Sequence, residues 1–180
     1  MEGREGDKRS YFKGKSYTIY KGVRGKFGAF RLSPSFPTRD IPMRDREGFV
    51  MLEMAGTIGP NRYDWENKVI FKLSLTDMAK ICMFMRNPGK KYNFCEQNSE
   101  GGVTHNSFQI FHDTSKASGR SGTETKNLRF TKSSNRHSVT VQMVHKRDSD
   151  TNKIVVPISP EESYIIINLL DGSFGNILSW

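Results

Sequence analysis

The chain has 180 residues, of which 28 are lysine or arginine and 19 are aspartate or glutamate, so its formal net charge is +9. This length predicts one domain with a sizeable core. The basic excess favours a polyanionic partner, although a solvated basic surface without such a partner has the same composition. No apolar run approaches the roughly 20 residues of a membrane span, and no hydrophobic signal peptide opens the chain.

Charge is uneven along the chain. Nine basic and three acidic residues lie through Arg31, whereas three acidic residues and no basic one follow residue 153. The basic part suits a polyanion, and the acidic, apolar end suits a protein contact. Two cysteines, Cys82 and Cys95, predict neither a disulfide framework nor a Cys-x-x-Cys metal site, which favours a reducing compartment.

The first ordered element is predicted at residues 17–20, because the charged, glycine-bearing residues before it favour no structure. Residues 1–15 are therefore expected to be a disordered basic segment, and residues 16–180 a single domain. Three prolines in residues 33–47 predict an extended connection, and residues 49–58 alternate as a strand.

Three glycines and three cations fall within residues 21–28. A glycine hinge is one interpretation, since small residues allow a tight turn or bulge. The other is that a phosphate chain approaches this backbone while nearby cations neutralise it. The two interpretations are compatible, and the spacing matches no dinucleotide or P-loop fingerprint.

A strand that leads directly into a helix is predicted in the middle of the chain. Alternation over residues 63–73 predicts the strand, with Trp65 among its apolar positions. Ser74, with Asp77 three residues later, predicts a capped helix over residues 75–87. Its apolar stripe would consist of Met78, Ile81, Cys82 and Met85.

The same arrangement recurs at the end of the chain. Residues 154–158 form an apolar strand, Ser159 can cap a helix over residues 161–171, and Gly172 is expected to end it. Further strands are predicted near residues 108–112, 128–131 and 139–143, with loops at 90–106, 116–126, 132–137 and 146–152. Eight strands in two sets of four, each set followed by a helix, predict two antiparallel sheets in an α+β domain.

Catalytic signals are weak. His105 and His112 lie near Asp113 without metal-ligand spacing, and His137 and His145 have no nucleophile placed by a motif. We therefore expect no enzyme, no catalytic residue, no metal, no cofactor and no small-molecule substrate.

Nucleic-acid signals are cumulative. Cations adjoin aromatic residues at 26–27, 30–31, 71–72 and 129–130, and cations bind phosphates while exposed rings stack on unpaired bases. Alternation assigns Phe71 and Phe130 to the core, so Phe27 or Phe30 is the expected stacking ring.

Several segments resemble the Whirly family of single-stranded nucleic-acid-binding proteins. Residues 17–22 are similar to the family's first strand, and Tyr-Asp-Trp-Glu at 63–66, with residues 71–74, to its fourth strand and helix start. Residues 111–113, 155–157 and 178–180 follow in matching order. The resemblance covers residues 16–180 and implies two roughly perpendicular four-stranded sheets, each with a helix.

The resemblance also implies a tetramer. It would assemble through the C-terminal helical region, where the expected interface residues are Tyr164, Ile165, Leu169, Phe174 and Ile177. Plant members carry a Lys-Gly-Lys-Ala-Ala-Leu-type motif, whereas residues 25–30 here are Gly-Lys-Phe-Gly-Ala-Phe. That departure and the inserts at 39–47 and 90–106 look more like the kinetoplastid mitochondrial RNA-binding proteins, which form heterotetramers of two related subunits.

The implied function is sequence-tolerant binding of single-stranded RNA, guide RNA and pre-edited messenger RNA, promoting annealing in the mitochondrial matrix, with no membrane partner. Any transit segment is expected to be absent from this chain. The expected nucleic-acid-binding residues are Lys21, Arg24, Lys26, Phe27, Phe30, Arg31, Lys68, Lys72, Lys126, Arg129 and Lys132. Two alternatives remain: a plant-type organellar single-stranded DNA-binding or transcription factor, and an interaction module whose basic face docks an acidic protein.

Overall fold

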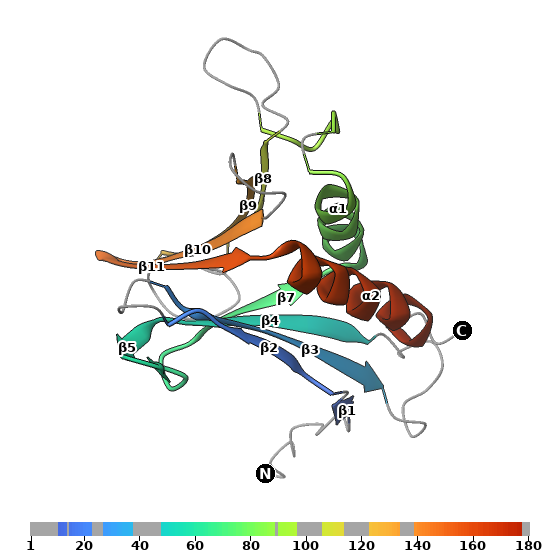
Figure 1. Cartoon of the computed structure of the whole chain (residues 1–180). Helices are drawn as coiled ribbons and strands as arrows, with labels where there is room; N and C mark the ends of the chain where they lie inside the picture. Colours follow the sequence, from blue (N-terminus) through green and yellow to red (C-terminus); the bar gives the residue numbers. More distant parts are fainter. Residues whose placement is uncertain are drawn as a thin grey trace, which may run out of the picture.

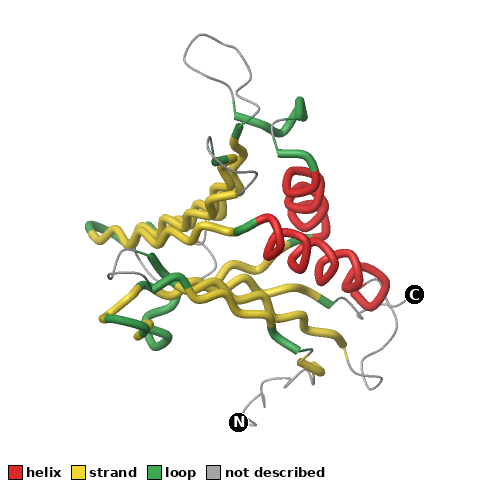
Figure 2. Tube along the Cα trace, in the orientation of Figure 1, coloured by secondary structure: helices red, strands yellow, loops and turns green. Residues whose placement is uncertain are grey.

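The computed structural model describes residues 11–13, 15–22, 27–37, 48–88, 90–96, 106–113, 123–133 and 139–177. Within them two large antiparallel sheets and two adjacent helices form an α+β domain (Figure 1, Figure 2). The first sheet consists of β1 (Tyr11–Lys13), β2 (Tyr17–Tyr20), β3 (Ala29–Pro37), β4 (Phe49–Ala55) and β7 (Val69–Leu73). The strands β5 (Thr57–Gly59) and β6 (Arg62–Tyr63) form a separate two-stranded sheet. The second large sheet consists of β8 (Ser107–Asp113), β9 (Glu124–Lys132), β10 (Val139–Arg147) and β11 (Asp150–Ile158).

The first sheet has five strands where four were predicted. β1 and β2 both pair with β3, Tyr11 opposite Pro37 and Tyr17 opposite Leu32, so they are successive segments on one edge. The sheet is therefore four strands wide. Because β1 pairs with β3, the expectation that all of residues 1–15 are disordered is wrong for residues 11–13; residues 1–10 lie outside the described ranges. β3 also continues to Pro37, inside the predicted proline-rich connection.

The predicted central strand over residues 63–73 is interrupted. β6 ends at Tyr63 and β7 begins at Val69, and the turn between them is closed by Asp64, whose carboxylate accepts hydrogen bonds from the Asn67 backbone and side chain at 2.9–3.2 Å. Val69, Phe71 and Leu73 are buried as predicted, but Trp65 lies in the turn. The alternating pattern misplaced Trp65 because an Asx turn gives the backbone a competing local hydrogen bond.

Helix α1 (Leu75–Arg86) confirms the predicted cap. The Asp77 backbone N–H donates to Ser74 Oγ at 3.1 Å, and the Ser74 backbone N–H donates to Asp77 Oδ2 at 3.0 Å. Two of the free N–H donors at the start of the helix are thus satisfied reciprocally. The predicted apolar stripe, including Met78 and Ile81, is buried.

Helix α2 (Pro160–Ile177) begins where predicted but passes through Gly172. Glycine costs about 1 kcal/mol in a helix interior. Burial of Leu170, Ser173 and Ile177 on the inward side offsets that cost, and the helix end is held where the Gly48 N–H donates to the Ile177 carbonyl at 3.2 Å. The expected stop at Gly172 is therefore wrong, because tertiary packing outweighs the local signal.

The second sheet has the order β11-β10-β9-β8. β10 and β11 form one long hairpin in which Arg147 faces Asp150 and Asp148 takes a positive φ of 53°. Asp tolerates that left-handed conformation better than most residues. The loop predicted over residues 146–152 is thus only a tight turn.

One hydrophobic core joins both sheets and both helices. Phe71 of the first sheet stacks on His112 of the second, with ring centroids 3.9 Å apart, and the Gly28 N–H donates to the Val155 carbonyl at 3.1 Å. Each sheet therefore buries one face in the shared core. The other face of each sheet is left uncovered by this core, and the candidate site lies on these two open faces.

Candidate nucleic-acid interface

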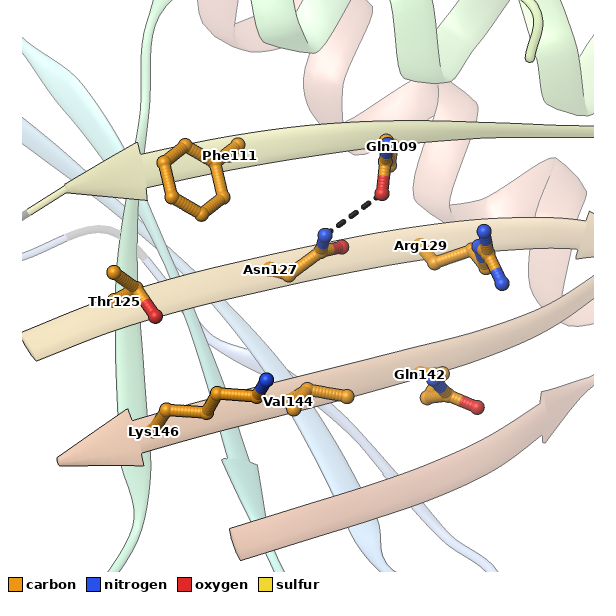
Figure 3. Close-up of a pocket in the computed structure, with 8 residues that line it drawn as sticks. All are labelled: Gln109, Phe111, Thr125, Asn127, Arg129, Gln142, Val144 and Lys146. Atoms are coloured by element: carbon orange, nitrogen blue, oxygen red, sulfur yellow. Dashed lines mark hydrogen bonds between the residues drawn. The ribbon is translucent and has the colours of Figure 1, made fainter. Parts of the chain in front are cut away.

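The open face of the second sheet carries a shallow hollow (Figure 3). Cross-strand register aligns Phe111, Asn127 and Val144 in one row and Gln109, Arg129 and Gln142 in the next. We call this surface the second-sheet face; its lining residues are Gln109, Phe111, Thr125, Asn127, Arg129, Gln142, Val144 and Lys146.

The second-sheet face combines an exposed ring, amides and cations. The Phe111 side chain is 58% exposed, and Asn127 Nδ2 donates to Gln109 Oε1 at 2.7 Å. Arg129 donates from Nε and Nη2 to Glu96 Oε1 at 3.0 and 2.8 Å, which fixes its guanidinium over the end of the hollow. Such a surface can contact both phosphates and bases.

The open face of the first sheet carries a charge network. Glu53 pairs with Lys68 at 2.5 Å and with Arg31 at 3.6 Å. Arg31 also donates to Thr18 Oγ1 at 3.2 Å, and its guanidinium carbon lies 3.9 Å from the Trp65 ring centroid. One carboxylate thus holds two cations, so this first-sheet face keeps a positive excess.

Aromatic residues gather beside that network. The Tyr20 and Tyr63 ring centroids are 5.1 Å apart, and Tyr20 meets Trp65 edge-on at 6.5 Å. Gly22 allows the Tyr63 ring to lie close to the backbone of residue 22, because a Cβ there would lie 2.5 Å from the Tyr63 hydroxyl oxygen. Gly22 thus has a close-approach role, while the tight turn or bulge expected in residues 21–28 falls mostly on residues 23–26, which lie outside the described residues.

The structure brings some predicted cations together. Arg31, Lys68 and Lys72 share the first-sheet face, where Lys72 Nζ lies 4.7 Å from the Phe49 ring centroid. Arg129 lies on the second-sheet face.

Other predicted cations lie elsewhere. Lys21 pairs with Glu162 of the α2 cap at 2.8 Å. Lys126 and Lys132 alternate with the open-face residues of β9, and Lys126 faces His112 and His145 in register on the inner side. The expected binding residues of β9 therefore lie on opposite faces of the sheet: Arg129 is on the second-sheet face, and Lys126 and Lys132 are on the other. Arg24 and Lys26 lie outside the described residues.

The two predicted stacking rings differ in exposure. Phe30 is 1% exposed in the core, so the expectation that its ring meets a base is wrong, whereas Phe27 is 36% exposed. Sequence reasoning missed Phe111. The signal was available, because strict alternation through residues 108–112 buries Phe108 and Ile110 and turns Phe111 outward.

The residues predicted for the oligomer interface also differ in exposure. Tyr164 is 69% and Ile165 43% exposed on α2, while Leu169 and Phe174 are half-buried against the core. Ile177 is 2% exposed and closes the core beside Gly48, so within the described chain it is a packing residue and not an open contact surface.

The Cys82 thiol near the core has a structural role and not a reactive one. Burial raises the pKa of the Cys82 thiol to about 12, and neighbouring Asp171 adds to the rise, so the thiol stays protonated at neutral pH. Among the described residues, no cluster of three or more His, Cys, Asp or Glu side chains could hold a metal ion. No helix in these ranges is long and apolar enough to cross a membrane.

The fold and its two open faces define an α+β protein that presents basic sheet surfaces. The family model described as Whirly transcription factor matches residues 19–169, and the chain belongs to the Whirly family. It is 26% identical over 168 residues to the chloroplastic single-stranded DNA-binding protein WHY1 of Solanum tuberosum, covering 91% of this chain and 54% of that protein. It is also 26% identical over 168 residues to the mitochondrial single-stranded DNA-binding protein WHY2 of Arabidopsis thaliana, covering 91% of this chain and 63% of that protein.

Solved structures show the same fold. The crystal structure of WHY1 from Arabidopsis thaliana superposes with a TM-score of 0.69 at 21% identity, covering 96% of this chain and 88% of that one. The structure of MRP1/MRP2 from Trypanosoma brucei gives 0.52 at 13% identity, covering 89% of this chain and 83% of that one. The chain spans between about half and two thirds of the length of the curated relatives.

Proposed function

We propose that this protein binds single-stranded nucleic acid with little sequence preference, mainly through phosphate contacts on its two open sheet faces. The observation that carries the proposal is that each sheet buries one face in the shared core and keeps lysine or arginine on the other. They include Arg31, Lys68 and Lys72 on the first sheet and Arg129 and Lys146 on the second. Cations on an open sheet hold phosphates without a groove shaped for a duplex.

In the first version of this proposal the strand is RNA, and the activity is annealing of complementary RNAs such as a guide RNA and pre-edited messenger RNA. Neutralising phosphates lowers the repulsion between two strands, while bases that are not gripped remain free to pair. The departure from the plant-type motif at residues 25–30 supports this version, and the chain shares its fold with MRP1/MRP2.

The second candidate is single-stranded DNA binding of the plant type. Relatives at 24–26% identity carry that name, which gives this version support at least equal to that of the RNA version. One of them is mitochondrial and two are chloroplastic. These relatives support an organellar location, and with the RNA version we propose that the organelle is the mitochondrion. We also propose assembly into a tetramer with a related Whirly-fold subunit.

Fluorescence anisotropy tests the proposal. One labelled sequence is presented as single-stranded RNA, single-stranded DNA and RNA duplex across a salt series. We expect both single strands to bind more tightly than the duplex. A triple variant, Lys72→Gln, Arg129→Gln and Lys146→Gln, should weaken all single strands alike and flatten the slope of log K against log salt by about 2, since each lost contact removes about 0.7.

The matched control is Lys91→Gln, an exposed lysine outside both sheets, which should change neither quantity. Tighter binding of RNA than of DNA, with faster annealing of complementary RNAs, would support the RNA version, and the reverse order the DNA version. No affinity for any strand at physiological salt would overturn the proposal and favour a module that docks an acidic protein.

A further inference from the structure

The hollow of the second-sheet face has charged ends and an uncharged middle. In Figure 3, Lys146 lies toward one end with Thr125, and Arg129 lies toward the other with Gln142. By cross-strand register the row of Phe111, Asn127 and Val144 lies between these two ends, and in Figure 3 the Phe111 ring lies on β8 toward the Lys146 end. A surface that binds phosphates alone needs no such uncharged, ring-bearing centre.

We propose that this hollow is a base-binding subsite that takes one unpaired base of the strand. The base stacks on the Phe111 ring, and the phosphates on its two sides reach Arg129 and Lys146. This inference rests on the proposed function and deepens it, because it adds a base contact to a surface otherwise assigned to phosphates.

Phe111 is suited to stacking because its ring is free. It is 58% exposed, and within the described part of the chain no other aromatic ring contacts it. Trp65 on the first-sheet face differs, since the Arg31 guanidinium already covers its ring at 3.9 Å. A base in a duplex is stacked and paired, so only an unpaired base can reach Phe111.

The amides explain why the subsite tolerates different bases. The hydrogen bond from Asn127 Nδ2 to Gln109 Oε1 leaves the Asn127 carbonyl as an acceptor and the Gln109 amino group as a donor. Every base offers at least one donor or acceptor on its exposed edge, and every base has a face that stacks. The hollow therefore favours an unpaired base over a purely apolar occupant.

The test compares Phe111→Ala and Phe111→Tyr in anisotropy assays. The probes are a uniform oligouridine, the matching oligothymidine and an abasic sugar-phosphate strand of equal length. Ile58→Ala is the control, because Ile58 is also an apolar side chain that is 58% exposed, on β5 away from the hollow. Melting temperatures of all variants verify folding, and sedimentation velocity of the protein alone reports its assembly.

We expect Phe111→Ala to weaken both base-bearing strands by roughly 5- to 150-fold, the range for loss of one base-aromatic stack. Phe111→Tyr should bind like the wild type, and Ile58→Ala should bind within twofold of it. Affinity for the abasic strand and the salt slope should not change, because no phosphate contact is lost.

Three results would overturn the subsite: equal loss on abasic and base-bearing strands, a change within twofold on all strands, or dissociation of the assembly by Phe111→Ala, which would make Phe111 a contact between copies. In each of these cases wild-type binding persists and the proposed function stands. If the wild type bound none of the strands, the proposed function itself would fail.

Discussion

Glu96 occupies the place that a phosphate would take on Arg129. Its Oε1 accepts two hydrogen bonds from Arg129, and its Oε2 accepts one from Ser107 Oγ at 2.6 Å. The carboxylate therefore orients the guanidinium and also competes with a strand for it. This pairing would moderate the affinity of Arg129 for a strand, because a phosphate that approaches the guanidinium must share it with Glu96 or displace Glu96.

Glu96→Gln should tighten binding of single strands by about two- to fivefold at low salt, because an exposed ion pair is worth up to about 1 kcal/mol. The salt slope should become slightly steeper. Anisotropy titration measures both, with Glu66→Gln as control, since Glu66 is exposed in the turn before β7. Weaker binding by Glu96→Gln would show that orientation of Arg129 matters more than competition.

His112 gives the fold a predictable pH dependence. Burial against Phe71 lowers its pKa, Lys126 lowers it further, and the Asp77 carboxylate, 3.9 Å away, partly opposes both. Below about pH 6.5, the ordinary value, the unfolded chain binds this proton more readily than the folded one. Stability is therefore lost as the pH falls from 6.5 toward the lowered value, and it levels off below that value.

His112→Gln should reduce this loss of stability at low pH. Urea denaturation at pH 7.5, 6.5 and 5.5 should show a smaller decline in the unfolding free energy for the variant than for the wild type, whatever their absolute stabilities. An unchanged decline would assign the pH dependence to other groups.

At the level of elements, Gly28 is one of the points where the two sheets meet. A Cβ at this position would lie 2.5 Å from both the Ala55 carbonyl oxygen and Ile154 Cγ2. The Ile154 methyl can move, but the Ala55 carbonyl belongs to the β4 backbone. The absence of a side chain at Gly28 thus sets how closely the first sheet approaches β11.

Gly28→Ala should destabilise the domain by about 1–3 kcal/mol, the range for overpacking a tight contact. Gly56→Ala is the matched control, since nothing lies within 4 Å of its Cβ position, and it should stay within about 0.5 kcal/mol. Urea midpoints measure both changes. Equal stability of the two variants would mean that the sheets separate without cost.

Elements with local signals could be predicted from the sequence, and those set by distant contacts could not. The cap at Ser74 was predictable because both partners lie within one turn. The passage of α2 through Gly172 depends on packing against the rest of the domain, and the Arg129–Glu96 pair joins residues 33 apart in the chain. Phe111 lies between these cases, because its outward direction follows from alternation once the strand is recognised.

At the scale of the whole molecule, the exposed stripe on α2 is the expected contact between subunits. Tyr164 and Ile165 stay exposed although most large apolar side chains are buried. If the proposed tetramer forms, Tyr164→Glu with Ile165→Glu should shift it to smaller species in sedimentation velocity, because charges would be buried without partners. Ile58→Glu, an equally apolar-to-acidic change on β5, should leave the assembly intact. A tetramer that survives the α2 variant would place the contact elsewhere.

The shared core has a consequence for stoichiometry. Since both sheets turn their inner sides toward the same packing, their outer sides point away from each other, and a strand that touches Lys72 and Arg129 of one molecule must bend around an edge of the domain. Short oligonucleotides would then occupy the two surfaces independently, at up to two equivalents per chain. Longer ones would cross the edge, and the number bound per chain would fall as their footprint grows.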